Sequence, residues 1–117
     1  MTLIEFYEKT GSNYNDVLGR IPSEALIKRF LKMLPRDTSM QLLTDSVASN
    51  DVATAFRAVH TIKGIALNLS LSSLSGVCSE MTEALRGKSE MPENISELYE
   101  KVHEEHTRVV NAIDQVD

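Results

Sequence analysis

A long apolar stripe in the middle of the chain constrains the fold more than any other feature of the sequence. Its members lie alternately three and four positions apart: Val52, Ala55, Val59, Ile62, Ala66 and Leu69. Such spacing places an apolar face along one side of an α-helix, and that face must be buried against other helices. The following segment repeats the pattern with Leu74, Val77 or Cys78, Met81 and Leu85. No segment shows the alternation of period two that is typical of strands, so we predict an all-α protein.

Helix ends are marked along the chain by capping residues and prolines. Thr38 fits the first position of a capping box, and Asn50 and Ser72 are expected to cap the next two helices. Pro22 and Pro92 are expected in the first turns of their helices. The expected helices are Thr2–Lys9, Ser12–Gly19, Pro22–Leu34, Thr38–Ala48, Asp51–Leu69, Ser72–Arg86 and Glu93–Val116.

Striped helices joined by short turns pack antiparallel to one another. We therefore expect an antiparallel four-helix bundle with additional short N-terminal helices, formed by a single domain over residues 1–117. A helical hairpin array would require internal repeats, and the sequence shows none.

Composition limits the classes of partner. Net charge is −5, which disfavours nonspecific binding to nucleic acid. No apolar run approaches the length of a membrane span, and the N-terminus lacks the pattern of a signal peptide. The single Cys78 rules out an internal disulfide and suits a reducing compartment. We expect a cytoplasmic protein with no nucleic-acid or membrane partner.

The motif His60-Thr61-Ile62-Lys63-Gly64 lies within the helix that carries the long stripe. At about 100° per residue, His60 and Gly64 fall roughly 130° and 170° from the centre of the apolar face. A solvent-facing glycine costs a helix on the order of 1 kcal/mol relative to alanine, so Gly64 is not explained by stability. Lys63 lies at the border of the face, with Arg57 and Asn68 on the outer surface. An accessible imidazole beside cations is suited to carrying a transferable anion.

The motif, followed by Asn68-Leu69, Leu74 and the stretch Cys78–Leu85, resembles the histidine-containing phosphotransfer (HPt) domains of bacterial multistep phosphorelays. The resemblance covers nearly the whole chain. It implies that His60 accepts a phosphoryl group from a receiver domain's aspartyl phosphate and passes it to another receiver aspartate. The partners implied are receiver domains of response regulators or hybrid histidine kinases.

The same resemblance implies roles for neighbouring residues. Lys63 matches the lysine that steadies the phosphoryl oxygens, and Arg86 resembles a basic residue that some members place nearby. Gly64 matches the glycine that allows close docking, with Arg57 and Asn68 on the same docking surface. Members often have a glutamine or acid that bonds the imidazole; here Thr82 stands near that position, with Glu83 as a possible substitute. The family usually has glycine where this chain has Ser70.

The chain shows no glycine-rich nucleotide loop, no P-loop and no aspartate cluster for Mg²⁺. We therefore expect a phosphocarrier rather than an enzyme, with no cofactor or metal of its own and with Mg²⁺ in the partner receiver. Two alternatives remain. One is a noncatalytic helical interaction module in which His60 is incidental. The other is the phosphorylated-histidine domain of a chemotaxis-type kinase system; a chain that begins at methionine and carries no kinase portion favours a free-standing carrier.

Several other groups are expected to be structural. The Glu-x-x-His motif from Glu100 to His103 resembles half of a di-iron site, but no second copy exists. His106 falls in an apolar seam, where partial burial is the ordinary explanation. Cys78 is expected to fill core space rather than act as a nucleophile. Packing roles are also expected for Met33, Met40 and Met81.

Overall fold

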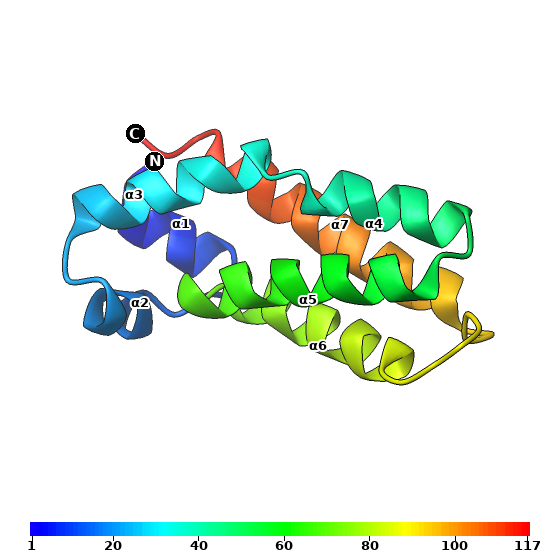
Figure 1. Cartoon of the computed structure of the whole chain (residues 1–117). Coiled ribbons are helices and arrows are strands. Elements are labelled where there is room, and N and C mark those ends of the chain that lie inside the picture. The colour runs from blue at the N-terminus through cyan, green and yellow to red at the C-terminus, as the bar shows by residue number, and fades with distance from the viewer.

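Helices account for all the regular secondary structure of the protein (Figure 1). The computed structural model describes all of residues 1–117. Its elements are α1 (Leu3–Lys9), α2 (Tyr14–Arg20), α3 (Glu24–Met33), a 3-10 turn η1 (Leu34–Arg36), α4 (Ser39–Ala48), α5 (Val52–Asn68), α6 (Ser72–Leu85) and α7 (Ile95–Ile113). The predicted all-α fold is therefore confirmed. None of these helices is both long and apolar enough to cross a membrane.

Helices α4 to α7 pack side by side, and each runs antiparallel to the one before it (Figure 1). Helix α5 contacts α4 and α6, while α7 contacts α6 and also returns to α4. Helix α3 continues the line of α4 on the other side of η1, where Pro35 lacks the amide that an α-helix would need. The short helices α1 and α2 lie at the end of the bundle where α5 terminates.

The predicted apolar stripes form the centre of the bundle. All six members of the stripe on α5 are buried, and Leu74, Cys78, Met81 and Leu85 are buried on α6. Val77 is only half-buried, so Cys78 is the residue that faces the core. Burial raises the pKa of the Cys78 thiol to about 12, which keeps it protonated and unreactive. Its expected role as a small apolar filler is confirmed.

Several predicted helix starts are wrong by one or two residues. Asp51, not Asn50, caps α5: its carboxylate accepts hydrogen bonds from the Thr54 amide at 3.2 Å and the Thr54 hydroxyl at 2.7 Å. Asn50 instead adopts a left-handed backbone with φ of 58° and ends the turn after α4, a conformation that asparagine tolerates well. Thr38 makes no side-chain cap, because the Asp37 carboxylate accepts the Ser39 amide at 2.8 Å in its place.

Three further end signals are displaced. Ser72 is already the first residue of α6 and Leu71 occupies the cap position without a side-chain hydrogen bond. Pro22 precedes the cap of α3, where the Ser23 hydroxyl accepts from the Leu26 amide. Pro92 lies in a turn before α7, which begins only at Ile95. The cap positions are held by Leu71, Ser23 and Asn94, so Ser72 lies inside its helix and both prolines lie before theirs.

The three methionines differ in their surroundings. Met40 and Met81 are buried, as predicted. Met33 is 58% exposed, so its expected packing role is wrong. It lies in the last turn of α3 and lines an open groove that faces the end of α5.

Candidate functional site

The outward face of α5 carries an exposed histidine and an exposed glycine one turn apart. His60 and Gly64 are both exposed, as the helical phase predicts. A Cβ atom added at Gly64 would meet no atom within 4 Å. Gly64 also has ordinary helical φ, so nothing in this domain's own packing or backbone requires glycine there. The surface is open for another molecule to approach the backbone beside the imidazole.

Cationic side chains surround this face. Arg57 is exposed one turn before His60, and its guanidinium donates to the Thr54 hydroxyl at 3.3 Å. Lys63 is half-buried at the border with α6, and the structure records no hydrogen bond or ion pair for its ammonium group. Arg86 follows the end of α6 and is ion-paired with Glu83 at 3.1 Å. Hydrogen bonds from Arg86, the charge of Arg86 and the charge of Lys63 lower the pKa of Glu83. Lys63 and Arg86 therefore both act on the region around Glu83, beside α5.

Phe56 also belongs to this site, although the sequence reasoning did not include it. Its ring lies nearly parallel to the His60 imidazole, with 5.9 Å between ring centroids and 4° between planes. The guanidinium carbon of Arg86 lies 5.2 Å from the centroid of the same ring. A signal was available: Phe56 is four residues before His60, and side chains at that spacing are neighbours on a helix.

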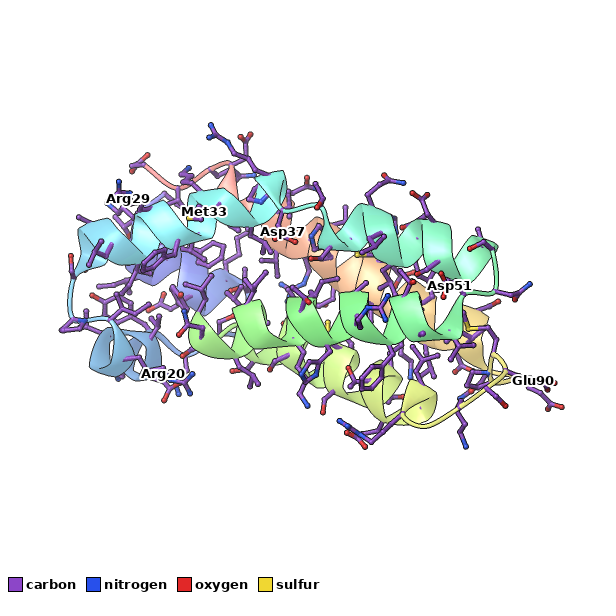
Figure 2. The ribbon with its side chains drawn as sticks, in the orientation of Figure 1. Arg20, Arg29, Met33, Asp37, Asp51 and Glu90 are labelled. Carbon is purple, nitrogen blue, oxygen red and sulfur yellow. The ribbon has the colours of Figure 1, made fainter.

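An apolar groove begins where the histidine face ends. It has a volume of about 490 Å³ and lies between the end of α5 and the segment formed by α3 and η1. Asn68, one turn beyond Gly64, lines it together with Phe30, Met33, Leu34, Arg36, Asp37, Ile65 and Leu69. Met33 and Asp37, labelled in Figure 2, mark the wall that lies opposite α5. The predicted docking residue Asn68 is thus at the edge of a preformed concave surface.

Comparison with known proteins agrees with this geometry. The family model described as "Hpt domain" matches residues 25–117. The chain belongs to the Hpt domain family. A crystal structure of the HPT domain from the Hpt sensor hybrid histidine kinase from Shewanella has a similar fold, with a TM-score of 0.73 and 21% sequence identity. That match covers 91% of this chain and 92% of the other. No curated protein sequence matches the chain.

The two side chains expected to orient the imidazole of this Hpt domain are engaged elsewhere. Thr82 is fully buried, and its hydroxyl donates to the Cys78 carbonyl at 2.7 Å. Glu83 accepts from Arg86 through both carboxylate oxygens, with Nε–Oε2 at 3.2 Å. The structure brings neither residue to His60, contrary to the expectation. Position 82 faces the bundle interior on α6, where a small hydroxyl satisfies itself within its own helix.

Ser70 ends α5 in the left-handed conformation that the family's usual glycine would adopt easily. Its φ is 54°, and its hydroxyl donates to the Asp16 carboxylate at 2.5 Å. Arg20 pairs with Asp16 at 3.3 Å and donates to the Leu67 carbonyl. The Tyr7 hydroxyl donates to the Leu69 carbonyl at 2.7 Å. Side chains from α1 and α2 therefore stabilise the turn that serine disfavours.

Substitutions at Ser70 should separate the stabilising hydrogen bond to Asp16 from the strain of the left-handed backbone. Ser70→Ala loses the bond to Asp16 and keeps the left-handed strain, so we expect unfolding free energy to fall by about 1 kcal/mol. Ser70→Gly also loses that bond but relieves about 1 kcal/mol of strain, so it should stay close to the wild type. Urea denaturation of the three proteins measures both changes. Equal stability of the alanine and glycine variants would contradict this account.

The remaining histidines of the Hpt domain lie on α7. His103 is exposed and stacks on Tyr99, with 5.7 Å between ring centroids. His106 is half-buried, as expected, and burial together with the nearby charge of His103 lowers its pKa. No three of the chain's His, Cys, Asp and Glu residues are grouped so that they could hold a metal ion.

Proposed function

We propose that this Hpt domain is a phosphocarrier that takes a phosphoryl group onto His60 from a receiver domain's aspartyl phosphate and passes it to the aspartate of another receiver. The observation that carries the proposal is the exposed imidazole beside the open backbone at Gly64. A receiver must bring its phosphorylated aspartate within bonding distance of a ring nitrogen. A flat, uncovered helix face allows two backbones to approach that closely.

The transfer requires a neutral imidazole. The ring nitrogen that carries no hydrogen attacks phosphorus, while the bond from phosphorus to the aspartyl oxygen breaks and the aspartate leaves as a carboxylate. The other ring nitrogen keeps its hydrogen, and the ring can then release a proton to water. Imidazole is suited to this step because an ordinary pKa of about 6.5 leaves much of it neutral near pH 7. In the transfer to the second receiver, the bond from the ring nitrogen to phosphorus breaks, and an oxygen of that receiver's aspartate forms the new bond to phosphorus.

Charge compensation is the contribution of the neighbouring cations. The migrating group carries negative charge on its three outer oxygens, and its transition state is stabilised by positive groups rather than by covalent assistance. Lys63 has no carboxylate partner in the structure, so it is free to approach these oxygens, and Arg86 can exchange Glu83 for them. The divalent cation of the reaction is proposed to belong to the receiver, so the carrier supplies the nucleophile, the cations and the docking face.

Docking extends from the histidine face into the groove. Arg57 lies on one side of His60, and Gly64 and Asn68 follow on the other, so the three positions border a continuous strip of α5. We assign this strip to receiver contact.

The proposal is tested by offering the purified protein a panel of phosphorylated receivers. We expect one or more of them to transfer label to the protein, in a form that is labile to acid and stable to alkali. Alkali stability distinguishes phosphohistidine from an acyl phosphate. Label that arrives only from the ATP-binding part of a kinase would instead indicate a chemotaxis-type system. Absence of label from every donor would favour a noncatalytic interaction module.

Replacing Lys63 by alanine should slow phosphoryl transfer by about tenfold without abolishing it, because one of several positive groups is lost. Single-turnover transfer from a phosphorylated receiver measures the change. Lys101→Ala is the matched control, since Lys101 is exposed on α7 and pairs with Glu80 at 3.4 Å. An unchanged rate for Lys63→Ala, or an equal loss in the control, would contradict the assigned role.

A further inference from the structure

The His60 imidazole stacks in parallel on the ring of Phe56, and it takes part in no hydrogen bond or ion pair. The centroid separation of 5.9 Å and the angle of 4° lie within the range of offset aromatic stacking. No protein group is hydrogen-bonded to either ring nitrogen, because Thr82 donates to Cys78 and Glu83 binds Arg86. The orientation of the ring therefore depends on packing against Phe56, and both nitrogens stay open to a reacting group.

Phe56 has a second neighbour, Arg86, which follows the end of α6. The Arg86 guanidinium lies over its ring at 5.2 Å, a geometry in which the aromatic face attracts the cation. The same guanidinium binds Glu83 through Nε and Nη2, at 3.2 and 3.1 Å. Phe56 is half-buried and packs against the hydrophobic core, so its own position is restrained. One restrained ring thus contacts both the imidazole and a cation that the proposed reaction would use.

We propose that Phe56 is a positioning residue for phosphoryl transfer. Its ring holds the imidazole in one orientation and holds the Arg86 guanidinium beside the site. The part concerning transfer rests on the proposed function, whereas the part concerning ring orientation does not. An exposed histidine without such a contact would divide its time among rotamers, and only some of these present a nitrogen in line with an incoming phosphorus.

The stack itself can be tested in the unphosphorylated protein. In proton NMR spectra, ring current from Phe56 should shift the carbon-bound imidazole protons of His60 upfield. Phe56→Leu should move these signals to the positions of an unstacked histidine, whereas Phe56→Tyr should keep them. His103 provides an internal control, because it stacks on Tyr99 at the other side of the bundle and its signals should not move. His60 signals that are unaffected by Phe56→Leu would overturn the proposal.

The kinetic test uses single-turnover transfer at a series of receiver concentrations. Phe56→Leu should lower the maximal rate about three- to tenfold, because losing one aromatic contact lowers the fraction of molecules whose imidazole is correctly oriented. The half-saturating receiver concentration should stay unchanged. Phe56→Tyr should restore the rate. In the Phe56→Leu background, Arg86→Gln should have a smaller effect than in the wild type, because Arg86 would already have lost its support.

Controls separate positioning from folding and from the proposed function. Circular dichroism verifies that Phe56→Leu keeps its helical content; if it does not, Phe56→Met replaces it in both tests. Equal rate losses for the leucine and tyrosine variants would mean that Phe56 only packs, and would overturn the proposal. If the wild-type protein takes no label from any receiver, the proposed function fails, and the NMR comparison alone decides whether Phe56 orients the imidazole.

Discussion

Replacing His60 by glutamine is expected to abolish phosphoryl acceptance, lowering label from a phosphorylated receiver at least about 100-fold, because the amide offers no nucleophilic ring nitrogen. Helical content and stability should remain close to the wild type, since His60 is exposed and contributes nothing to the core. Label that is stable to alkali, measured on both proteins after mixing with the same receiver, checks this result.

His103→Gln is the matched control for that experiment. His103 is also exposed and also stacks on an aromatic residue four positions earlier, but it lies on α7. It should accept label at the wild-type rate. Retention of alkali-stable label by His60→Gln would show that another group carries the phosphoryl, and loss of label in the His103 variant would show that the two histidines cannot be distinguished in this way.

Replacing Gly64 by glutamine should have the second-largest effect. The new side chain fits the isolated domain, because its Cβ meets no atom within 4 Å, and it should raise unfolding free energy by about 0.5–1 kcal/mol through helix propensity. The same side chain occupies the surface on which the receiver approaches His60. We expect transfer to slow on the order of 100-fold, the effect of displacing reacting groups by about 1 Å. Thermal unfolding and single-turnover transfer measure the two opposing changes.

Gly76→Gln controls for the helix effect. Gly76 lies within α6, is exposed, has ordinary helical φ and has equally open space beside it. Its substitution should give the same gain in stability with an unchanged transfer rate. If Gly64→Gln transferred the phosphoryl group at the wild-type rate, close approach of the receiver's backbone would not explain this glycine. The docking surface assigned to α5 would then be wrong.

The helices and the outward face of α5 could be predicted because they depend on periodicity. The spacing of Val52, Val59 and Ile62 defines the buried side of α5, and the phase of His60 and Gly64 follows from helical geometry alone. The resemblance to phosphotransfer domains was carried by a motif within one helix and by the apolar pattern of the next helix, and the family match over residues 25–117 confirms it.

The contacts that the sequence did not predict depend on tertiary geometry. Asn50 and Asp51 are both good caps, and only the path of the turn decides which of them binds the Thr54 amide. The rotation of α6 about its axis turns Thr82 toward the interior and places Glu83 on the surface, where it pairs with Arg86. Met33 is exposed because it lies at an open groove between the end of α3 and the end of α5. Each of these outcomes is set by how one helix lies against another.

The hydrogen bonds around Ser70 affect which fragments of this protein would keep the end of α5 fully supported. Tyr7, Asp16 and Arg20 hold the final turn of α5, and all three precede the region 25–117 that the family shares. A fragment cut to that shared region would retain every proposed catalytic and docking residue while losing the side chains that bind the turn after α5. The region that the family shares and the set of residues that stabilise the end of α5 therefore have different boundaries in this chain.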